Sequence, residues 1–340
     1  MSACNSQNKK FYLGMVLGIN ATVLIYFICW PLEFISLNQI PWVRSSRFNQ
    51  ENVFRYASRW LNHNTDLMSA LIEDEDTIAK QMFNSVRIAC LILTAPKLLD
   101  VKAIHVKNTW AKRCNLDLFM SSAQNDSFPT VGLNVTEGYD HLTAKTLHAF
   151  KYMYDHHLAD ADWFLKADDD TYVIMENLRY FLSNEDPSLP VYFGQRLKPF
   201  VRQGYASGGS GYVISSEALS RFGRTGFGNK EMCAGDHVYE DVAFGQCLQN
   251  LGVILKPSTD VLNRTRFHGH TLREHVHSRI PKGYMENYDF ENGRSGPENI
   301  SRYAISFHHV QPDEMLELEF LLYHVRPFGV LNLPVEVNVT

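Results

Sequence analysis

Three consecutive aspartates, Asp168, Asp169 and Asp170, are the residues whose type and spacing point most clearly to chemistry. They follow the apolar run 163–165 and precede the β-prone segment 171–174. Three like charges at the end of a buried strand repel one another unless a counter-ion is bound. Carboxylate oxygens are suitable ligands for a divalent cation. The sequence therefore predicts a cation-binding strand end.

The segments before the triplet predict the elements that must position it. Apolar, β-rich runs at 86–94, 116–120 and 163–167 predict strands, and the stretches 100–112 and 140–158 between them predict helices. Right-handed crossovers would make these strands parallel and would align their carboxyl ends at one edge of a sheet. Open α/β folds bind ligands at that edge. The triplet is thus expected at a ligand site.

Shorter elements are expected after the triplet, and they make the sheet mixed. The predicted fold class is therefore α/β, with a mixed, mainly parallel sheet flanked by helices. We expect strands at 191–193, 211–214 and 253–255, and helices at 216–222, 241–250 and 315–324.

The composition excludes a nucleic-acid-binding surface. The chain has 340 residues, 45% of them apolar, and its net charge is −5 with 14 neutral histidines. A polyanion needs a strongly basic partner, and this chain offers none. The length and apolar content are those of a globular domain with a sizeable core.

The segment 11–30 predicts a membrane anchor. It contains twenty residues without a charge, which is enough for a helix to cross a bilayer. Lys9 and Lys10 precede it and Glu33 follows it, so the positive-inside rule places the short N-terminus in the cytosol. A cleaved signal peptide is the rival interpretation, but Cys29-Trp30-Pro31 lacks a small-residue cleavage site.

The anchor divides the chain into four predicted parts. Residues 1–10 form a cytosolic tail, residues 11–30 the transmembrane helix of a type II protein, and residues 31–83 a luminal stem. Residues 84–340 form the folded domain, which starts close to the first strand. This topology predicts a Golgi membrane protein whose folded domain lies in the lumen.

The predicted topology gives the cysteines different roles. Cys90, Cys114, Cys233 and Cys247 would lie in an oxidising lumen, where an even set favours disulfides. Of the three possible pairings we expect Cys90–Cys114 and Cys233–Cys247, because each closes a short local segment. Zinc is the alternative, but no close Cys-x-x-Cys pair supports it. A homodimer remains open, with Cys29 as one candidate contact.

Five N-glycosylation sequons agree with a secretory topology without proving it. Such short motifs often arise by chance. They begin at Asn125, Asn134, Asn263, Asn299 and Asn338.

Four longer motifs carry a family resemblance. They span residues 103–114, 160–173, 203–213 and 306–310. Together they resemble the animal core 1 β1,3-galactosyltransferases, which belong to the wider group of fringe-like β1,3-glycosyltransferases. The resemblance covers nearly the whole luminal domain. It implies a GT-A fold, a UDP-sugar donor and, as the usual cofactor, Mn²⁺.

The resemblance assigns roles around the triplet. By position in the motif, Asp170 is the first metal ligand, and Asp168 binds either the metal or the nucleotide ribose. Asp169 orients the nucleotide or the sugar. His308 matches the histidine that completes the metal site, and His309 is the alternative. A divalent ion there would stabilise the charge on a departing UDP.

A second acidic pair, Glu240-Asp241, matches the start of a helix in the same family. One of these carboxylates can accept the proton of the acceptor hydroxyl, and Asp241 is our preferred general base. Glu240 is the competing base. Ordinary capping of a helix N-terminus by carboxylates is the structural alternative.

Three further features are weaker candidates for the nucleotide site. Thr94 ends the first predicted strand, and Arg113 follows the first predicted helix. A helix cap and a surface charge are their structural alternatives. The glycine-rich segment 207–211 predicts a turn that lets a ligand approach the backbone closely.

The implied function is an inverting transfer of galactose from UDP-galactose to the C3 hydroxyl of O-linked N-acetylgalactosamine on glycoproteins. Residues 279–302 depart from the family and lack the adjacent cysteines found near this position in vertebrate members. Alternatives therefore stay open: a β1,3-transferase with another donor or acceptor, or a noncatalytic membrane-bound folding factor or glycan-binding relative.

Overall fold

A computed structural model of the chain describes residues 77–325, except 234, 236–238, 292 and 294, and they lie within one compact unit, Asp66–Thr340. The predicted tail (1–10), the predicted anchor (11–30), most of the predicted stem (31–83) and Asn338 lie outside the described residues. Within those residues, none of the helices combines the length and the apolar character that a membrane span needs.

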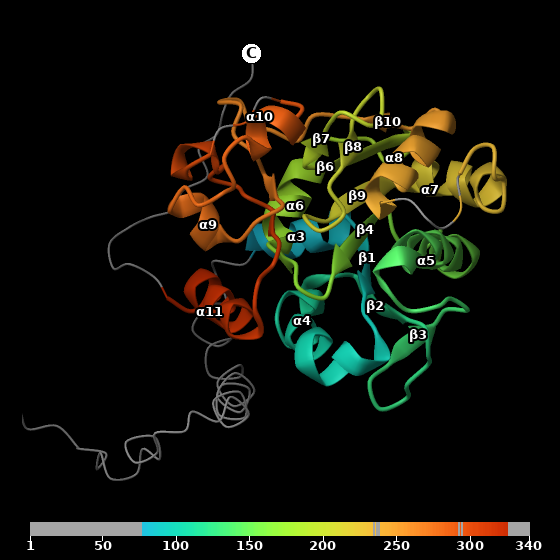
Figure 1. The fold of residues 1–340 in the computed structure, drawn as a ribbon. Helices are drawn as coiled ribbons and strands as arrows, with labels where there is room; N and C mark the ends of the chain where they lie inside the picture. The colour runs from blue at the N-terminus through green and yellow to red at the C-terminus, as the bar shows by residue number, and fades with distance from the viewer. Residues whose placement is uncertain (1–76, 234, 236–238, 292, 294, 326–340) are drawn as a thin grey trace, which may run out of the picture. The chain divides into compact units, whose positions relative to one another are not determined.

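A seven-stranded sheet forms the centre of the described unit (Figure 1). The pairs β1–β2, β1–β4, β2–β3 and β10–β6 are parallel, whereas β9 pairs antiparallel with both β4 and β6. The mixed, mostly parallel sheet predicted from the sequence is therefore confirmed. In spatial order its strands are β10 (Ile254–Leu255), β6 (Val191–Gly194), β9 (Tyr212–Ser215), β4 (Trp163–Asp168), β1 (Ile88–Leu93), β2 (Leu116–Ser121) and β3 (Thr130–Gly132).

Helices cover both faces of the sheet. In Figure 1, α5, α7 and α8 gather on one side, and α4 and α11 lie on the other. The helices are α3 (Thr77–Ser85), α4 (Ile104–Asn108), α5 (Leu142–His157), α6 (Met175–Leu182), α7 (Ser216–Arg221), α8 (Glu240–Asn250), α9 (Leu272–Val276), α10 (Tyr284–Tyr288) and α11 (Pro312–Tyr323).

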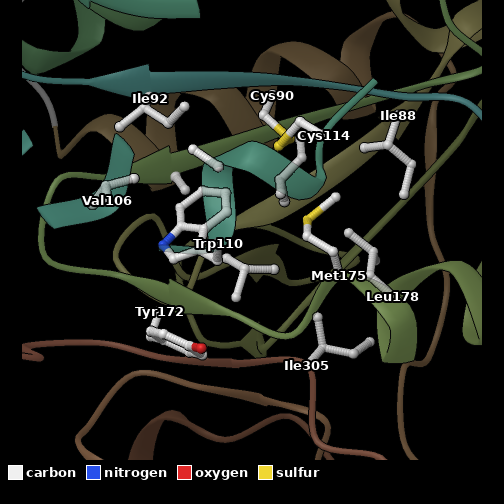
Figure 2. Packing of buried hydrophobic residues seen from close by; sticks show 14 of the residues in the cluster. Ile88, Cys90, Ile92, Val106, Trp110, Cys114, Tyr172, Met175, Leu178 and Ile305 are labelled. Carbon is white, nitrogen blue, oxygen red and sulfur yellow. A yellow bond between two sulfur atoms is a disulfide. The ribbon is translucent and has the colours of Figure 1, made fainter. Parts of the chain in front are cut away.

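Strand β1 shows why both faces need helices. All six of its residues are buried, and their side chains alternate between two apolar clusters, as the period of two in a strand requires. Figure 2 shows the cluster that receives Ile88, Cys90 and Ile92, together with Trp110. A strand buried on both faces is typical of the centre of a parallel sheet.

The predicted helix 100–112 is interrupted in the structure. A π-helical turn (Leu99–Ala103) leads into α4, and a 3₁₀ turn (Trp110–Arg113) follows it. At the break, Thr109 leaves helical backbone angles, and its hydroxyl donates to the carbonyl of His105 at 2.7 Å. The break buries Trp110, whose Nε1–H donates to the carbonyl of Thr171 at 2.9 Å. The helix is thus interrupted where the Trp110 indole is buried.

Both predicted disulfides are present. Cys90–Cys114 ties β1 to the segment before β2, and Cys233–Cys247 ties the approach to α8 to the helix itself. Cys90 and Cys114 lie in the cluster shown in Figure 2. Disulfides of this kind form in oxidising compartments, which agrees with the predicted luminal domain.

The sequons differ in exposure. Asn134 and Asn263 are exposed, whereas Asn299 is buried and its amide donates to the hydroxyl of Thr265. A buried asparagine cannot carry a glycan in the folded domain. Asn134 and Asn263 are therefore the better placed acceptors of the four that the structure describes.

A small second sheet joins distant parts of the chain. It consists of β11 (Phe267–His268), β12 (Ser306–Phe307) and β5 (Tyr172–Val173), in that order. The antiparallel pairing of β12 with β5 brings the segment after Phe307 next to the aspartate triplet. A hairpin of β7 (Arg196–Leu197) and β8 (Tyr205–Ala206) precedes the glycine-rich segment.

Candidate active site

The aspartate triplet lies at the carboxyl end of β4, as predicted. Asp168 is the last residue of the strand and pairs in register with Leu93 of β1. Thr94 directly follows Leu93, and its hydroxyl donates to Asp169 Oδ2 at 2.8 Å. Thr94 therefore orients an aspartate of the triplet, and the parallel pairing of β1 with β4 is what places it there.

His308, the residue directly after β12, reaches the triplet. The backbone N–H of Val310 donates to the carbonyl of Asp170 at 2.9 Å, which fixes this segment against the triplet. His308 Nε2 lies 3.2 Å from Asp170 Oδ1. His309 is adjacent, and ligand atoms of Asp170, His308 and His309 all lie within 4.8 Å of one another.

These three side chains fit a divalent metal. One carboxylate and two imidazoles form a donor set used by first-row divalent ions. Of the predicted metal ligands, Asp170 and His308 are brought together. Asp168 is instead paired with Lys166, whose Nζ lies 2.8 Å from Asp168 Oδ1.

A second group of charges surrounds Lys166. This lysine is buried in β4, and its Nζ donates to the carbonyl of Gly208 at 3.1 Å. It also lies 3.7 Å from Glu240 Oε2 at the start of α8. One ammonium therefore joins the triplet, the glycine-rich segment and the acidic pair, which sequence spacing alone did not connect.

The two members of the acidic pair have different surroundings. Glu240 is buried and accepts a hydrogen bond from the hydroxyl of Tyr212 at 2.7 Å. Asp241 is less buried, and it accepts hydrogen bonds from the backbone N–H groups of Gly208 (3.3 Å) and Val242 (2.9 Å). Asp241 is thus held in place while remaining partly open to solvent, as a proton acceptor for an incoming substrate must be.

Burial raises the pKa of both carboxyl groups of the pair above their ordinary values. For Glu240 the Lys166 ammonium opposes this rise, and for Asp241 the hydrogen bond from the Gly208 N–H opposes it, yet each pKa stays raised. A raised pKa makes a carboxylate a stronger base. The shift therefore favours the predicted role of this pair in proton acceptance.

The pKa values of Asp169 and Asp170 are shifted in opposite directions. Burial raises the pKa of Asp169 to about 7, although the Thr94 hydroxyl opposes the shift. Burial would also raise the pKa of Asp170, but His308 and the Lys102 ammonium outweigh it and hold the pKa well below its usual range. Lys102 Nζ donates to Asp170 Oδ2 at 2.9 Å. Asp170 is therefore held more strongly as an anion than Asp169.

The glycine-rich segment approaches both groups closely. A Cβ on Gly208 would lie 2.4 Å from Glu240 Oε2, and one on Gly209 would lie 2.1 Å from the His308 ring. The Thr171 hydroxyl donates to the Gly209 carbonyl at 2.8 Å. The segment needs glycine at 208 and 209 because side chains of the site occupy the space that a Cβ would take.

Arg113 is not brought to the triplet. Its guanidinium forms a two-pronged pair with Glu319 of α11, with N–O distances of 2.5 and 3.1 Å. It also stacks 3.7 Å above the ring of Tyr323. These contacts give Arg113 a structural role between the 3₁₀ turn and α11.

A family comparison agrees with this arrangement of residues. The sequence model described as Fringe-like matches residues 91–320, which include β4, the triplet, α8 and β12. The chain belongs to the Fringe-like family.

Proteins similar to this chain carry the names of different enzymes. A Xenopus laevis protein named glycoprotein-N-acetylgalactosamine 3-beta-galactosyltransferase 1 is 43% identical over 264 residues, covering 76% of this chain and 72% of that protein. Mouse chondroitin sulfate synthase 3 is 30% identical over 47% of this chain and 20% of its own length. Mouse beta-1,3-glucosyltransferase is 30% identical over 44% of this chain and 30% of its own length.

Solved structures similar to this chain are more distant in sequence. A glycosyltransferase involved in glycosylation of the major capsid of PBCV-1 is 14% identical, with a TM-score of 0.39, over 69% of this chain and 100% of that one. The galactosyltransferase LgtC, solved with donor and acceptor sugar analogues, is 13% identical, with a TM-score of 0.40, over 70% of this chain and 97% of that one.

Sequence reasoning missed Lys166 and Lys102 as members of the site. Lys166 had a usable signal, because a lysine inside a strand that is otherwise buried and apolar needs an anionic partner. The triplet begins only two residues later. Lys102 had no such signal, since its contact with Asp170 joins the π-helical turn to a distant part of the chain.

We expect Gly209→Ala to weaken Mn²⁺ binding by at least about tenfold, because the new Cβ would push the His308 ring away from Asp170. Binding is measured by electron paramagnetic resonance of free Mn²⁺. Gly235→Ala is the matched control, since a Cβ there meets nothing within 4 Å. Unchanged Mn²⁺ affinity in a folded Gly209→Ala protein would remove His308 from the metal site.

Proposed function

We propose that this chain transfers galactose from UDP-galactose to the C3 hydroxyl of N-acetylgalactosamine linked to serine or threonine of glycoproteins, with inversion. The observation that carries the proposal is the 43% identity to the Xenopus galactosyltransferase over 76% of the chain. The clustering of Asp168, Asp170, Glu240, Asp241 and His308 at one edge of the sheet supports it.

Asp241 accepts the proton in this mechanism. The acceptor oxygen forms its bond to galactose C1 as the bond from C1 to the UDP oxygen breaks, and the hydroxyl proton moves to the Asp241 carboxylate. The N–H groups of Gly208 and Val242 hold that carboxylate in position. Glu240 is the weaker candidate, because Tyr212 and Lys166 already engage its two oxygens.

Asp170 and His308 are the residues that would hold Mn²⁺, with Asp168 close by. When bound, the ion supplies a Lewis acid that stabilises negative charge on the diphosphate leaving group. Thr94 and Asp169 contribute to the nucleotide side of the site, where the Thr94 hydroxyl fixes the Asp169 carboxylate. The contacts of Arg113 with Glu319 favour a structural role for Arg113 rather than a role in nucleotide binding.

The proposal includes the cellular setting. The sheet architecture corresponds to a GT-A type domain, anchored in the Golgi membrane by residues 11–30 with residues 31–83 as its stem. The two disulfides support a luminal domain. The proposal also includes a homodimer, for which the sequence offers Cys29 as one candidate contact.

The test is turnover by the full chain in detergent. We expect UDP-galactose to be consumed with a peptide carrying N-acetylgalactosamine on threonine, and chelation of divalent ions to stop the reaction. UDP-N-acetylglucosamine, UDP-glucuronic acid and UDP-glucose form the donor panel, because relatives are named for other sugars. The linkage in the product is determined by nuclear magnetic resonance.

The outcomes separate the candidate functions. A β1,3-linked galactose on N-acetylgalactosamine supports the proposal. Turnover with another donor would show that the chain is a glycosyltransferase but that UDP-galactose is not its donor. No turnover across the whole panel, with binding to client glycoproteins retained, would favour the noncatalytic folding factor or glycan-binding relative.

A further inference from the structure

A groove of about 500 Å³ lies between α9 and α11, which are neighbours in Figure 1. Arg273 of α9 and Glu314 of α11 both line it, and they pair with each other, because Arg273 Nε lies 3.7 Å from Glu314 Oε1. The rest of its surface is mostly apolar, so the groove suits an apolar occupant. Its apolar lining residues are Leu272, Val276, Val310, Leu318 and Leu321.

Both walls of the groove keep apolar side chains exposed. Leu321 of α11 is 61% exposed, and Val276 of α9 is 44% exposed. Apolar side chains that remain exposed together on one surface mark a binding site for a partner. The residues that α11 contributes follow the spacing i, i+3, i+4 and i+7 of a single helix face, and they are Glu314, Glu317, Leu318 and Leu321.

The sequence that follows α11 has the pattern of a suitable occupant. Every second residue from Leu331 to Val339 is apolar, and each residue between them is polar or proline. A period of two is typical of an extended segment with one buried side. Such a segment needs an apolar surface to cover its odd-numbered residues. The residues on its other side are Asn332, Pro334, Glu336, Asn338 and Thr340.

The segment is long enough to return along the whole groove. The described part of the structure ends at Val325, two residues after α11. Pro327 and Gly329 follow, and these residue types are typical of a reversal of the chain. The twelve residues of α11 rise about 18 Å. The ten residues 331–340 span about 33 Å when extended, which exceeds the length of the helix.

We propose that residues 331–339 bind in extended form in the groove between α9 and α11, with their odd-numbered side chains against Val276 and Leu321. A segment tethered to one wall of the groove has a high effective concentration there, which favours it over a second copy or a separate protein.

The groove also adjoins the candidate active site. Val310 lines the groove, and its N–H donates to the carbonyl of Asp170 at 2.9 Å. A segment bound in the groove therefore packs against the same backbone that contacts the aspartate triplet. The inference thus adds an internal strap to the domain, which the proposed function does not require.

Hydrogen exchange followed by mass spectrometry tests the proposal on the full chain in detergent. The variant chain ends after Val325, so it lacks the segment and keeps α11. We expect the backbone amides of α9 and α11 to exchange at least about tenfold faster in this variant, because the groove walls open more often without the segment. Amides of β1 and β2 should keep the parent rate, which verifies that the domain stays folded.

Substitutions on the two sides of the segment separate specific binding from a general effect of the C-terminal residues. The triple variant Leu331→Ser, Leu333→Ser, Val335→Ser should reproduce the faster exchange. The double variant Asn332→Ser, Glu336→Gln is the matched control. It should leave the exchange rates unchanged, because these two side chains point away from the groove in the proposed arrangement.

The groove side is tested by Leu321→Ser. This substitution removes a contact of the segment and should speed exchange in α9, and truncation after Val325 should then add little to the effect. A synthetic peptide of residues 326–340 should slow exchange of the truncated chain again. It should leave the full chain unaffected, since the groove there is already occupied.

The proposal is overturned if the truncated chain exchanges at the parent rate in both α9 and α11. An equal loss of protection in the double control variant and the serine triple variant overturns it too. Protection that depends on protein concentration and not on the segment would assign the groove to a second copy instead. These readouts need no sugar transfer, so failure of the galactosyltransferase proposal and failure of this one remain distinguishable.

Discussion

The substitution Asp241→Asn is expected to lower the rate of galactose transfer by about 10²- to 10⁴-fold, the usual contribution of a positioned general base. The amide has nearly the same shape as the carboxylate and can still accept the hydrogen bond from the Gly208 N–H. It cannot take the proton of the acceptor hydroxyl. UDP affinity should stay close to that of the parent, because the proposed metal ligands Asp170 and His308 are unchanged.

The measurement is kcat/KM with UDP-galactose and a glycosylated threonine peptide, beside UDP binding by calorimetry. Asp126→Asn, an exposed aspartate outside the site, is the matched control and should retain full activity. Glu240→Gln tests the competing base. If Glu240→Gln lost turnover while Asp241→Asn kept it, the roles of the two carboxylates would be exchanged.

The substitution Lys166→Met is expected to lower the free energy of unfolding by about 3–5 kcal/mol, because it leaves buried charge without its partner. Lys166 is buried between Asp168 and Glu240, and both carboxylates lie within 4 Å of its Nζ. Burial opposes the charged form of the ammonium, yet these carboxylates raise its pKa above the ordinary value. Methionine fills similar space but supplies no charge.

Urea unfolding followed by tryptophan fluorescence measures this loss. Lys151→Met is the matched control: Lys151 pairs with Asp155 on a more exposed helix face, where an ion pair contributes about 0–1 kcal/mol. Adding Glu240→Gln to Lys166→Met should restore part of the stability, since the two residues are coupled. Equal losses for Lys166→Met and Lys151→Met would show that the buried ammonium is not required for stability.

The sequence predicted those parts of the fold that depend on local pattern. The apolar runs became β1, β2 and β4, parallel as expected, and this pairing placed Thr94 beside Asp169. Both disulfides were predictable because each closes a short segment. The position of the triplet at the carboxyl end of a buried strand was predictable because an apolar run directly precedes it.

Features that depend on contacts between distant segments could not be predicted from the sequence. The break at Thr109 follows from the burial of Trp110. Local helix propensities do not predict that burial. The pairing of Arg113 with Glu319 needs the position of α11. The sequence does not reveal the left-handed backbone conformation of His309. From the sequence, His308 and His309 were therefore alternatives, whereas in the structure both side chains lie beside Asp170.

The pairing of β5 with β12 fixes an order of assembly. Tyr172 and Phe307 are neighbours across these strands, although they are far apart in the chain. During synthesis from the N-terminus, the aspartates emerge long before the histidines, and domains fold as their segments become available. A chain that has not reached residue 308 holds the carboxylates without an imidazole. The candidate cation site can therefore assemble only after residue 308 has been synthesised, and a shorter polypeptide carries no complete catalytic centre.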